Sequence, residues 1–197
     1  LPTHEITNQA PPSVDYNLAD EDPVLLDGVA REGASWASGE VWAFGEALGK
    51  AEILEAGHLA NKHGPELTLF DRYGHRIDEV RFHPSYHTMF GLGARHGVHS
   101  VAWMAEEGGG HVAHIALEYL LTQVEAGVCC PLTMTYAVVP ALRHEAEIAE
   151  QWLPRLLRRD YDPRMVPADQ KRAVTFGMAM TEKQGGSDVR ANTTSAR

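Results

Sequence analysis

Apolar side chains between Asp22 and Leu157 recur mostly at intervals of three and four residues, the spacing that places them on one face of an α-helix. Asp22 suits the N-cap and Pro23 the first turn of the first predicted helix. Pro140 should kink or interrupt a later one. Further helical segments are expected at about 35–48, 51–62, from 84 onward, 110–127, 132–144 and 147–157, and the most regular of them, 110–127, should be central.

Two segments change to the two-residue alternation that is typical of strands. Between Leu67 and Phe82, apolar residues flank the turn-rich sequence Asp71–Gly74, which predicts a β-hairpin inserted among the helices. From Ala173 onward a second alternation predicts the first strand of another domain; its larger residues are Val174, Phe176, Met178 and Met180. The predicted fold class is therefore mainly α, with a small β-hairpin and the beginning of a β domain.

Proline-rich segments divide the chain into three predicted parts. Residues 1–22 include three prolines and little apolar periodicity, which indicates an extended arm that becomes ordered only by lying on something else, such as a neighbouring subunit. Residues 160–170, with two prolines, are typical of a linker. We therefore expect an arm over 1–22, a helical domain over 23–170, and the start of a middle β domain over 171–197.

The composition is that of a soluble globular protein, with 44% hydrophobic and 22% charged residues. No apolar run approaches the roughly 18 residues that a bilayer crossing requires, and the first residues do not resemble a secretion signal. We expect a cytoplasmic protein without membrane contact.

Cys129 and Cys130 are adjacent, which disfavours a disulfide between them and predicts reduced, buried thiols.

The charge balance bears on nucleic acids. Seventeen basic and 27 acidic residues give a net charge of 17 − 27 = −10 at pH 7, and such a chain repels a phosphate backbone.

Eleven histidines raise the separate question of a metal site, particularly at His96/His99 and His111/His114, whose spacing allows a shared helix face. Neither pair belongs to a known ligand motif, so hydrogen-bonded or surface histidines are expected, and no metal site is predicted.

The segment from Met178 to Val189 is the most informative for function, because an apolar run ends there in two hydroxyls, a carboxylate and two glycines. Gly185 and Gly186 allow a turn with few steric limits. The hydroxyls of Thr181 and Ser187, with nearby free amides, could bind a flavin edge or a phosphate. An ordinary capped loop explains the same residues, and on physical grounds alone it is the favoured reading.

The sequence of 180–194, MTEKQGGSDVRANTT, resembles the flavin-contacting signature of the acyl-CoA dehydrogenase family, MTE-x-x-x-GSD-V followed by Thr. Its central Lys183-Gln184-Gly185 is closer to the AidB, or adaptive-response, branch than to ordinary members. Other segments resemble that branch in the same order, so the likeness covers nearly the whole chain as the N-terminal portion of such a protein. They are 31–36, 65–67, 80–84, 123–127 and 130–135.

The resemblance implies an FAD-dependent oxidoreductase acting on CH–CH donors, in which a carboxylate removes a proton α to a thioester while a hydride passes to the flavin. It places Met178 and Met180 beside the isoalloxazine, Thr181 at the pyrimidine edge, Ser187 at the pyrophosphate, and Gly186 among the cofactor-binding residues. Glu182 and Asp188 are expected to hold the loop. No catalytic residue is assigned, because the family supplies its base from a later helical domain.

The resemblance also implies a homotetramer, an acyl-CoA or related ligand, and a link to DNA alkylation through a basic C-terminal portion beyond these residues. Two alternatives stay open. One is a DNA-protection scaffold in which FAD is structural and dehydrogenase activity is small. The other is a flavin-free helical module that makes subunit contacts.

Overall fold

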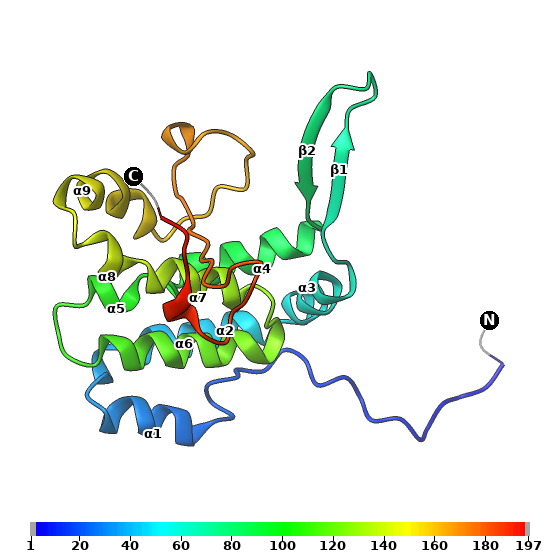
Figure 1. Cartoon of the computed structure of the whole chain (residues 1–197). Helices are drawn as coiled ribbons and strands as arrows, with labels where there is room; N and C mark the ends of the chain where they lie inside the picture. The colour runs from blue at the N-terminus through cyan, green and yellow to red at the C-terminus, as the bar shows by residue number, and fades with distance from the viewer. Residues whose placement is uncertain (1–2, 196–197) are drawn as a thin grey trace.

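Helix α6 (Gly110–Val124) runs through the middle of the helical bundle in the computed structural model, which describes residues 3–195 (Figure 1). It contacts α1, α2, α3, α5 and α7. The three- and four-residue spacing of its apolar side chains buries one broad face, so the predicted central helix is confirmed. The buried residues of α6 are Ala113, His114, Ala116, Leu117, Leu120 and Leu121.

Five helices build the first part of the bundle, and their core includes the fully buried Phe44, Leu48 and Met89. The Asp22 carboxylate caps the first helix by accepting from the Leu25 amide at 2.9 Å, as predicted. The elements are α1 (Pro23–Arg31), a 3₁₀ turn (Ser35–Ala37), α2 (Ser38–Leu48), α3 (Ala51–Lys62), α4 (Pro84–Arg95) and α5 (Val101–Met104).

Three helices follow α6: α7 (Cys129–Ala137), α8 (Val139–Leu142) and α9 (Ala146–Leu156). The predicted interruption at Pro140 is confirmed, because this proline lies in the first turn of α8, directly after the break from α7. A second, smaller core forms here around Val139, Leu156 and Val174, and Trp152 and Phe176 pack against it. The segment after residue 170 is thus anchored to α8 and α9.

The predicted hairpin is also confirmed. Strands β1 (Glu66–Phe70) and β2 (Arg76–Arg81) pair antiparallel, with Leu67 opposite Val80, and the hairpin projects from the bundle (Figure 1). The Asp71 carboxylate accepts the amides of Tyr73 and His75 and so closes the turn. Leu67, at 61% exposed, shows that the hairpin buries little of its apolar surface.

The N-terminal residues 3–16 run as an extended strip without helix or strand (Figure 1). The strip ends against α2, where Leu18 and Ala19 are buried.

The division of the chain into a helical and a β domain near residue 170 stays a prediction. Within residues 3–195, none of the helices combines the length and apolar character needed to cross a membrane.

Two expectations need correction. The alternating segment from Ala173 forms no strand within residues 3–195, because its amides bond to helix-borne groups and no neighbouring strand pairs with it. Cys130 is exposed, although Cys129 is buried.

Candidate functional site

The first part of the candidate cofactor segment packs against helix α7. The Phe176 amide donates to the Thr135 hydroxyl at 3.1 Å, and the Met178 amide to the Met134 sulfur at 3.2 Å. The Thr135 hydroxyl itself donates to the Pro131 carbonyl at 2.7 Å and is fully buried. The backbone that leads into the flavin-like signature is therefore placed by consecutive residues of α7.

The signature then folds into a loop organised by Glu182. Glu182 and Gly185 exchange two backbone hydrogen bonds, at 3.0 and 3.1 Å, which close a tight turn. The Glu182 carboxylate accepts the amides of Thr193, at 3.0 Å, and Thr194, at 2.6 Å. These bonds lower the pKa of Glu182, the contacts with Thr194 having the largest effect. The loop's two ends are thus joined through one carboxylate.

Two further contacts complete the loop. Asp188 caps a 3₁₀ turn (Val189–Ala191) by accepting from the Arg190 amide at 3.2 Å, and the Asn192 amide group donates to the Met180 carbonyl at 2.9 Å. The expectation that Glu182 and Asp188 hold the loop is confirmed by these bonds. A shallow cavity of about 290 Å³ lies over the turn, lined by Glu182, Gln184, Gly185, Gly186, Ser187, Asp188, Ala191 and Asn192.

The structure brings some of the predicted cofactor residues together and separates others. A Cβ on Gly186 would lie 2.6 Å from the Thr181 methyl carbon, so these two residues touch. Ser187 lines the loop cavity beside Gly186. Met178 and Met180 do not line it; their side chains are 54% and 60% exposed. The apolar and polar residues therefore form two neighbouring surfaces.

These two surfaces suit the two parts of a flavin nucleotide. Exposed Met side chains offer an adaptable apolar face for a ring system, while the Ser187 hydroxyl and the amides of a glycine turn are donors of the kind that bind phosphate oxygens. Within residues 3–195, the hydroxyls of Thr181 and Ser187 make no hydrogen bond to another side chain or to the backbone, so both remain available to a ligand.

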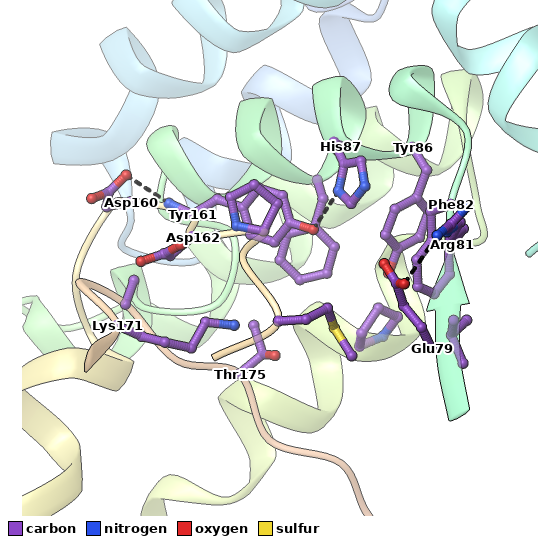
Figure 2. Close-up of a pocket in the computed structure, with 16 residues that line it drawn as sticks. Glu79, Arg81, Phe82, Tyr86, His87, Asp160, Tyr161, Asp162, Lys171 and Thr175 are labelled. Carbon is purple, nitrogen blue, oxygen red and sulfur yellow. Dashed lines mark hydrogen bonds and ion pairs between the residues drawn. The ribbon is translucent and has the colours of Figure 1, made fainter. Parts of the chain in front are cut away.

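A second, larger cavity of about 470 Å³ adjoins the same segment (Figure 2). Sequence reasoning missed it, because it joins the base of the hairpin and α4 to the predicted linker. Its rings form two stacked pairs, Phe82 on Tyr86 at 4.1 Å and Phe90 on Tyr161 at 4.5 Å between centroids. The i, i+4 spacing of the aromatic residues before and on α4 was the only signal in the sequence.

Polar groups surround these rings. His87 Nδ1 lies 2.8 Å from the Tyr161 hydroxyl, and burial raises the pKa of Tyr161 while lowering that of His87. The amine of Lys171 and the hydroxyl of Thr175 point into the cavity (Figure 2). Thr175 lies three residues before Met178, so this cavity and the candidate flavin loop share one backbone segment.

The paired histidines bind protein groups. His96 Nδ1 lies 2.8 Å from the Glu40 carboxylate, and His99 Nε2 lies 3.1 Å from the Arg158 carbonyl. His111 Nδ1 is 2.7 Å from the Tyr136 hydroxyl, and His114 Nδ1 is 2.6 Å from the Val98 carbonyl. Each of these residues has a ring nitrogen engaged in tertiary structure, as expected for hydrogen-bonded histidines.

Residues 8–163 match the family model described as the adaptive response protein AidB N-terminal domain. The chain is 45% identical over 196 residues to a candidate acyl-CoA dehydrogenase named AidB from Escherichia coli (strain K12). It is 28% identical over 153 residues to acyl-CoA dehydrogenase family member 11 of Caenorhabditis elegans. These alignments include 98% and 74% of this chain, but 36% and 23% of the relatives' lengths.

Solved structures share the fold. The crystal structure of Caenorhabditis elegans ACDH-11 in complex with C11-CoA superposes with a TM-score of 0.75 at 24% identity, over 98% of this chain and 33% of that one. The Bd2924 apo-form also gives 0.75, at 26% identity, over 94% of this chain and 37% of that one. This chain therefore spans about a third of the length of most of the relatives that it matches.

Proposed function

This chain belongs to the AidB N-terminal domain family, within the acyl-CoA dehydrogenase group, and on that premise we propose that it forms one wall of an FAD site in an AidB-type flavoprotein. The wall consists of Met178, Met180, Thr181, Gly186 and Ser187. The observation that carries the proposal is the loop of residues 180–194, where the two ends are joined through Glu182 while the hydroxyls of Thr181 and Ser187 stay available.

Each residue has a distinct proposed task. The exposed side chains of Met178 and Met180 bind the ring system, and the Thr181 hydroxyl donates to an acceptor on its edge. Gly186 allows close approach to Thr181, and Ser187 donates to the pyrophosphate. When bound, FAD supplies the hydride acceptor, and the protein's part is to bind and orient it.

One solved relative supports the proposed substrate, and the exposed hairpin supports the proposed assembly. A member of the group was solved in complex with C11-CoA, which supports an acyl-CoA as the ligand of the whole protein. The exposed apolar hairpin, with Leu67 at 61% and Tyr73 at 74% exposed, supports a subunit contact in a homotetramer. We assign the proposed link to DNA alkylation to segments outside residues 1–197, because this chain carries a net charge of −10.

The proposal is tested by flavin titration of the whole protein to which these residues belong. We expect it to contain FAD non-covalently, whereas residues 1–197 alone bind FAD weakly, since they present one wall only. Thr181→Val removes one hydrogen bond to a neutral acceptor, so affinity should fall roughly fivefold while the fold is kept.

Thr175→Val is the matched control, because it makes the same change in the same segment but within the neighbouring cavity. It should leave FAD affinity unchanged. Equal affinities of the Thr181→Val variant and the unmodified protein would exclude Thr181 as a direct ligand. A whole protein that purifies without flavin and does not take it up would refute the proposed function.

A further inference from the structure

The cavity beside α4 has an aromatic wall (Figure 2). Its volume of about 470 Å³ lies within the range of small-molecule sites, roughly 300 to 1,000 Å³. Tyr86 lies between two neighbouring rings, with its centroid 4.1 Å from that of Phe82 and 5.9 Å from that of Phe90. Phe90 in turn stacks on Tyr161 at 4.5 Å. The four rings therefore form one continuous surface, which favours a rigid aromatic ligand over a flexible chain.

The carboxylates that line this cavity are each paired with an arginine. The nitrogen–oxygen distances are 3.2, 3.1 and 2.6 Å for the pairs Glu79–Arg81, Asp160–Arg172 and Asp162–Arg164. Lys171 also lines the cavity, and it takes part in none of the ion pairs of residues 3–195. Its amine points into the hollow (Figure 2). Within this part of the chain, the Lys171 amine is therefore the cation of the cavity that can pair with an anionic ligand.

The other polar groups of the cavity add no charge. His87 Nδ1 lies 2.8 Å from the Tyr161 hydroxyl. Burial lowers the pKa of His87 and raises that of Tyr161, so both side chains are uncharged at neutral pH. Thr175 contributes a neutral hydroxyl. One cation beside a neutral donor matches the single charge of a carboxylate better than the charge of a phosphate, which is roughly −2 at neutral pH.

We propose that this cavity binds a flat aromatic carboxylate, with its ring system against the wall of Phe82, Tyr86, Phe90 and Tyr161 and its carboxylate on the Lys171 amine. None of the proposed flavin-binding residues lines the cavity, so this site is separate from the flavin wall. The ligand contacts both α4 and the segment 160–175, and so joins the helical bundle to the chain that leads into the flavin loop.

The charge contact is tested by calorimetric titration of indole-3-acetate into the whole protein to which these residues belong. We expect a dissociation constant on the order of 0.1 mM, an ordinary strength for a ligand of this size. Lys171→Met should weaken binding about tenfold, because a charged hydrogen bond is lost at a partly exposed position. Lys171→Arg keeps the cation and should weaken binding by less than about threefold.

Lys50→Met is the matched control, because it removes the same charge from an exposed lysine that does not line the cavity. It should leave the affinity for indole-3-acetate unchanged. Flavin content is measured by absorbance in the same samples. It reports on the proposed FAD site independently, so the failure of either proposal can be recognised by itself.

Two further probes separate the charge from the ring. Indole-3-acetamide has the same ring system without the charge, so it should bind about tenfold more weakly than indole-3-acetate. Its affinity should be the same for Lys171→Met and for the unmodified protein, which also shows that the variant is folded. Decanoate has the charge without a ring, so it should bind at least about fivefold more weakly than indole-3-acetate.

A tenfold loss for indole-3-acetate, with no loss for indole-3-acetamide, supports the contact with Lys171. Equal affinities of Lys171→Met and the unmodified protein for indole-3-acetate overturn it, as does the absence of saturable binding. Decanoate that binds as tightly as indole-3-acetate overturns the aromatic class of the ligand.

Discussion

Gly45 of α2 lies directly against Ala19, the residue at which the N-terminal arm joins the core. A Cβ on Gly45 would stand 2.6 Å from the Ala19 backbone nitrogen and would also collide with the Asn17 side chain. The Gly45 carbonyl accepts from the Leu18 amide at 3.2 Å, so the close approach coincides with a backbone hydrogen bond. The arm is fixed to the bundle where a glycine leaves room for it.

Gly45→Ala should therefore destabilise the chain by about 2 to 3 kcal/mol, because the obstacle is backbone and cannot rotate away. Gly28→Ala is the matched control: Gly28 lies inside α1, and a Cβ added there would meet nothing within 4 Å. That change should stabilise the chain by about 0.5 to 1 kcal/mol. Urea unfolding measures both, and equal stabilities of the two variants would contradict the proposed close packing.

His99 should make stability depend on pH. Burial lowers the pKa of His99 to about 4, from an ordinary value of 6.5. The folded state thus keeps this imidazole neutral. Its contribution to the free energy of unfolding is therefore complete above pH 6.5 and is lost as the pH falls toward 4. The loss should approach 3 kcal/mol, about 1.4 kcal/mol for each unit of pKa difference.

Urea unfolding at pH values from 7 to 4.5 measures this dependence. His99→Gln retains a donor for the Arg158 carbonyl and should flatten the profile, whereas the exposed His144→Gln should not change it. His87 and His114, whose pKa values burial also lowers, should leave a smaller residual slope of the same sign. A His99→Gln profile parallel to that of the unmodified chain would show that His99 is not the responsible group.

The adjacent cysteines should differ in reactivity. Cys130 is exposed, while Cys129 is buried and burial raises the pKa of its thiol. Iodoacetamide should therefore modify one thiol rapidly in the folded chain and the second only after unfolding. Cys130→Ser should remove the rapid phase, and Cys129→Ser should leave it unchanged, as followed by mass spectrometry; two equally fast thiols would contradict the burial of Cys129.

Residues 1–197 should not bind DNA in a salt-sensitive way at physiological ionic strength. With a net charge of −10, the chain releases few counterions from a phosphate backbone. Fluorescence anisotropy with a labelled duplex measures this. Binding at micromolar concentration or tighter, weakened by added salt, would require a basic surface on the helical bundle.

The sequence by itself determined the elements whose signals are local. The three- and four-residue periodicity predicted α6, Asp22 and Pro23 predicted the start of α1, and Pro140 predicted the break before α8. The turn residues predicted the hairpin. Such features depend on residues within about four positions of one another along the chain. The sequence pattern therefore includes every residue that determines them.

The candidate flavin loop was found by resemblance, because its residue types alone favoured an ordinary capped loop. The tertiary structure supplied its closure, since the Glu182 carboxylate reaches Thr193 and Thr194 across the loop. It likewise brought Tyr161, from the expected linker, into a cavity with Phe90. Periodicity identifies a helix face but not what covers it: Trp36 and Trp42 lie at helical positions, yet they are 37% and 42% exposed.

Only the tertiary structure decided the conformation of the segment from Ala173 and the hydrogen-bond partners of His114 and Glu118. Alternating side chains make a segment able to form a strand, but a strand exists only where another backbone accepts its hydrogen bonds, and here α7 provides a hydroxyl and a sulfur instead. His114 and Glu118 are four residues apart on any helix. The partners of their side chains, the Val98 carbonyl for His114 and the Thr133 hydroxyl for Glu118, are contributed by distant parts of the chain and come together only when it folds.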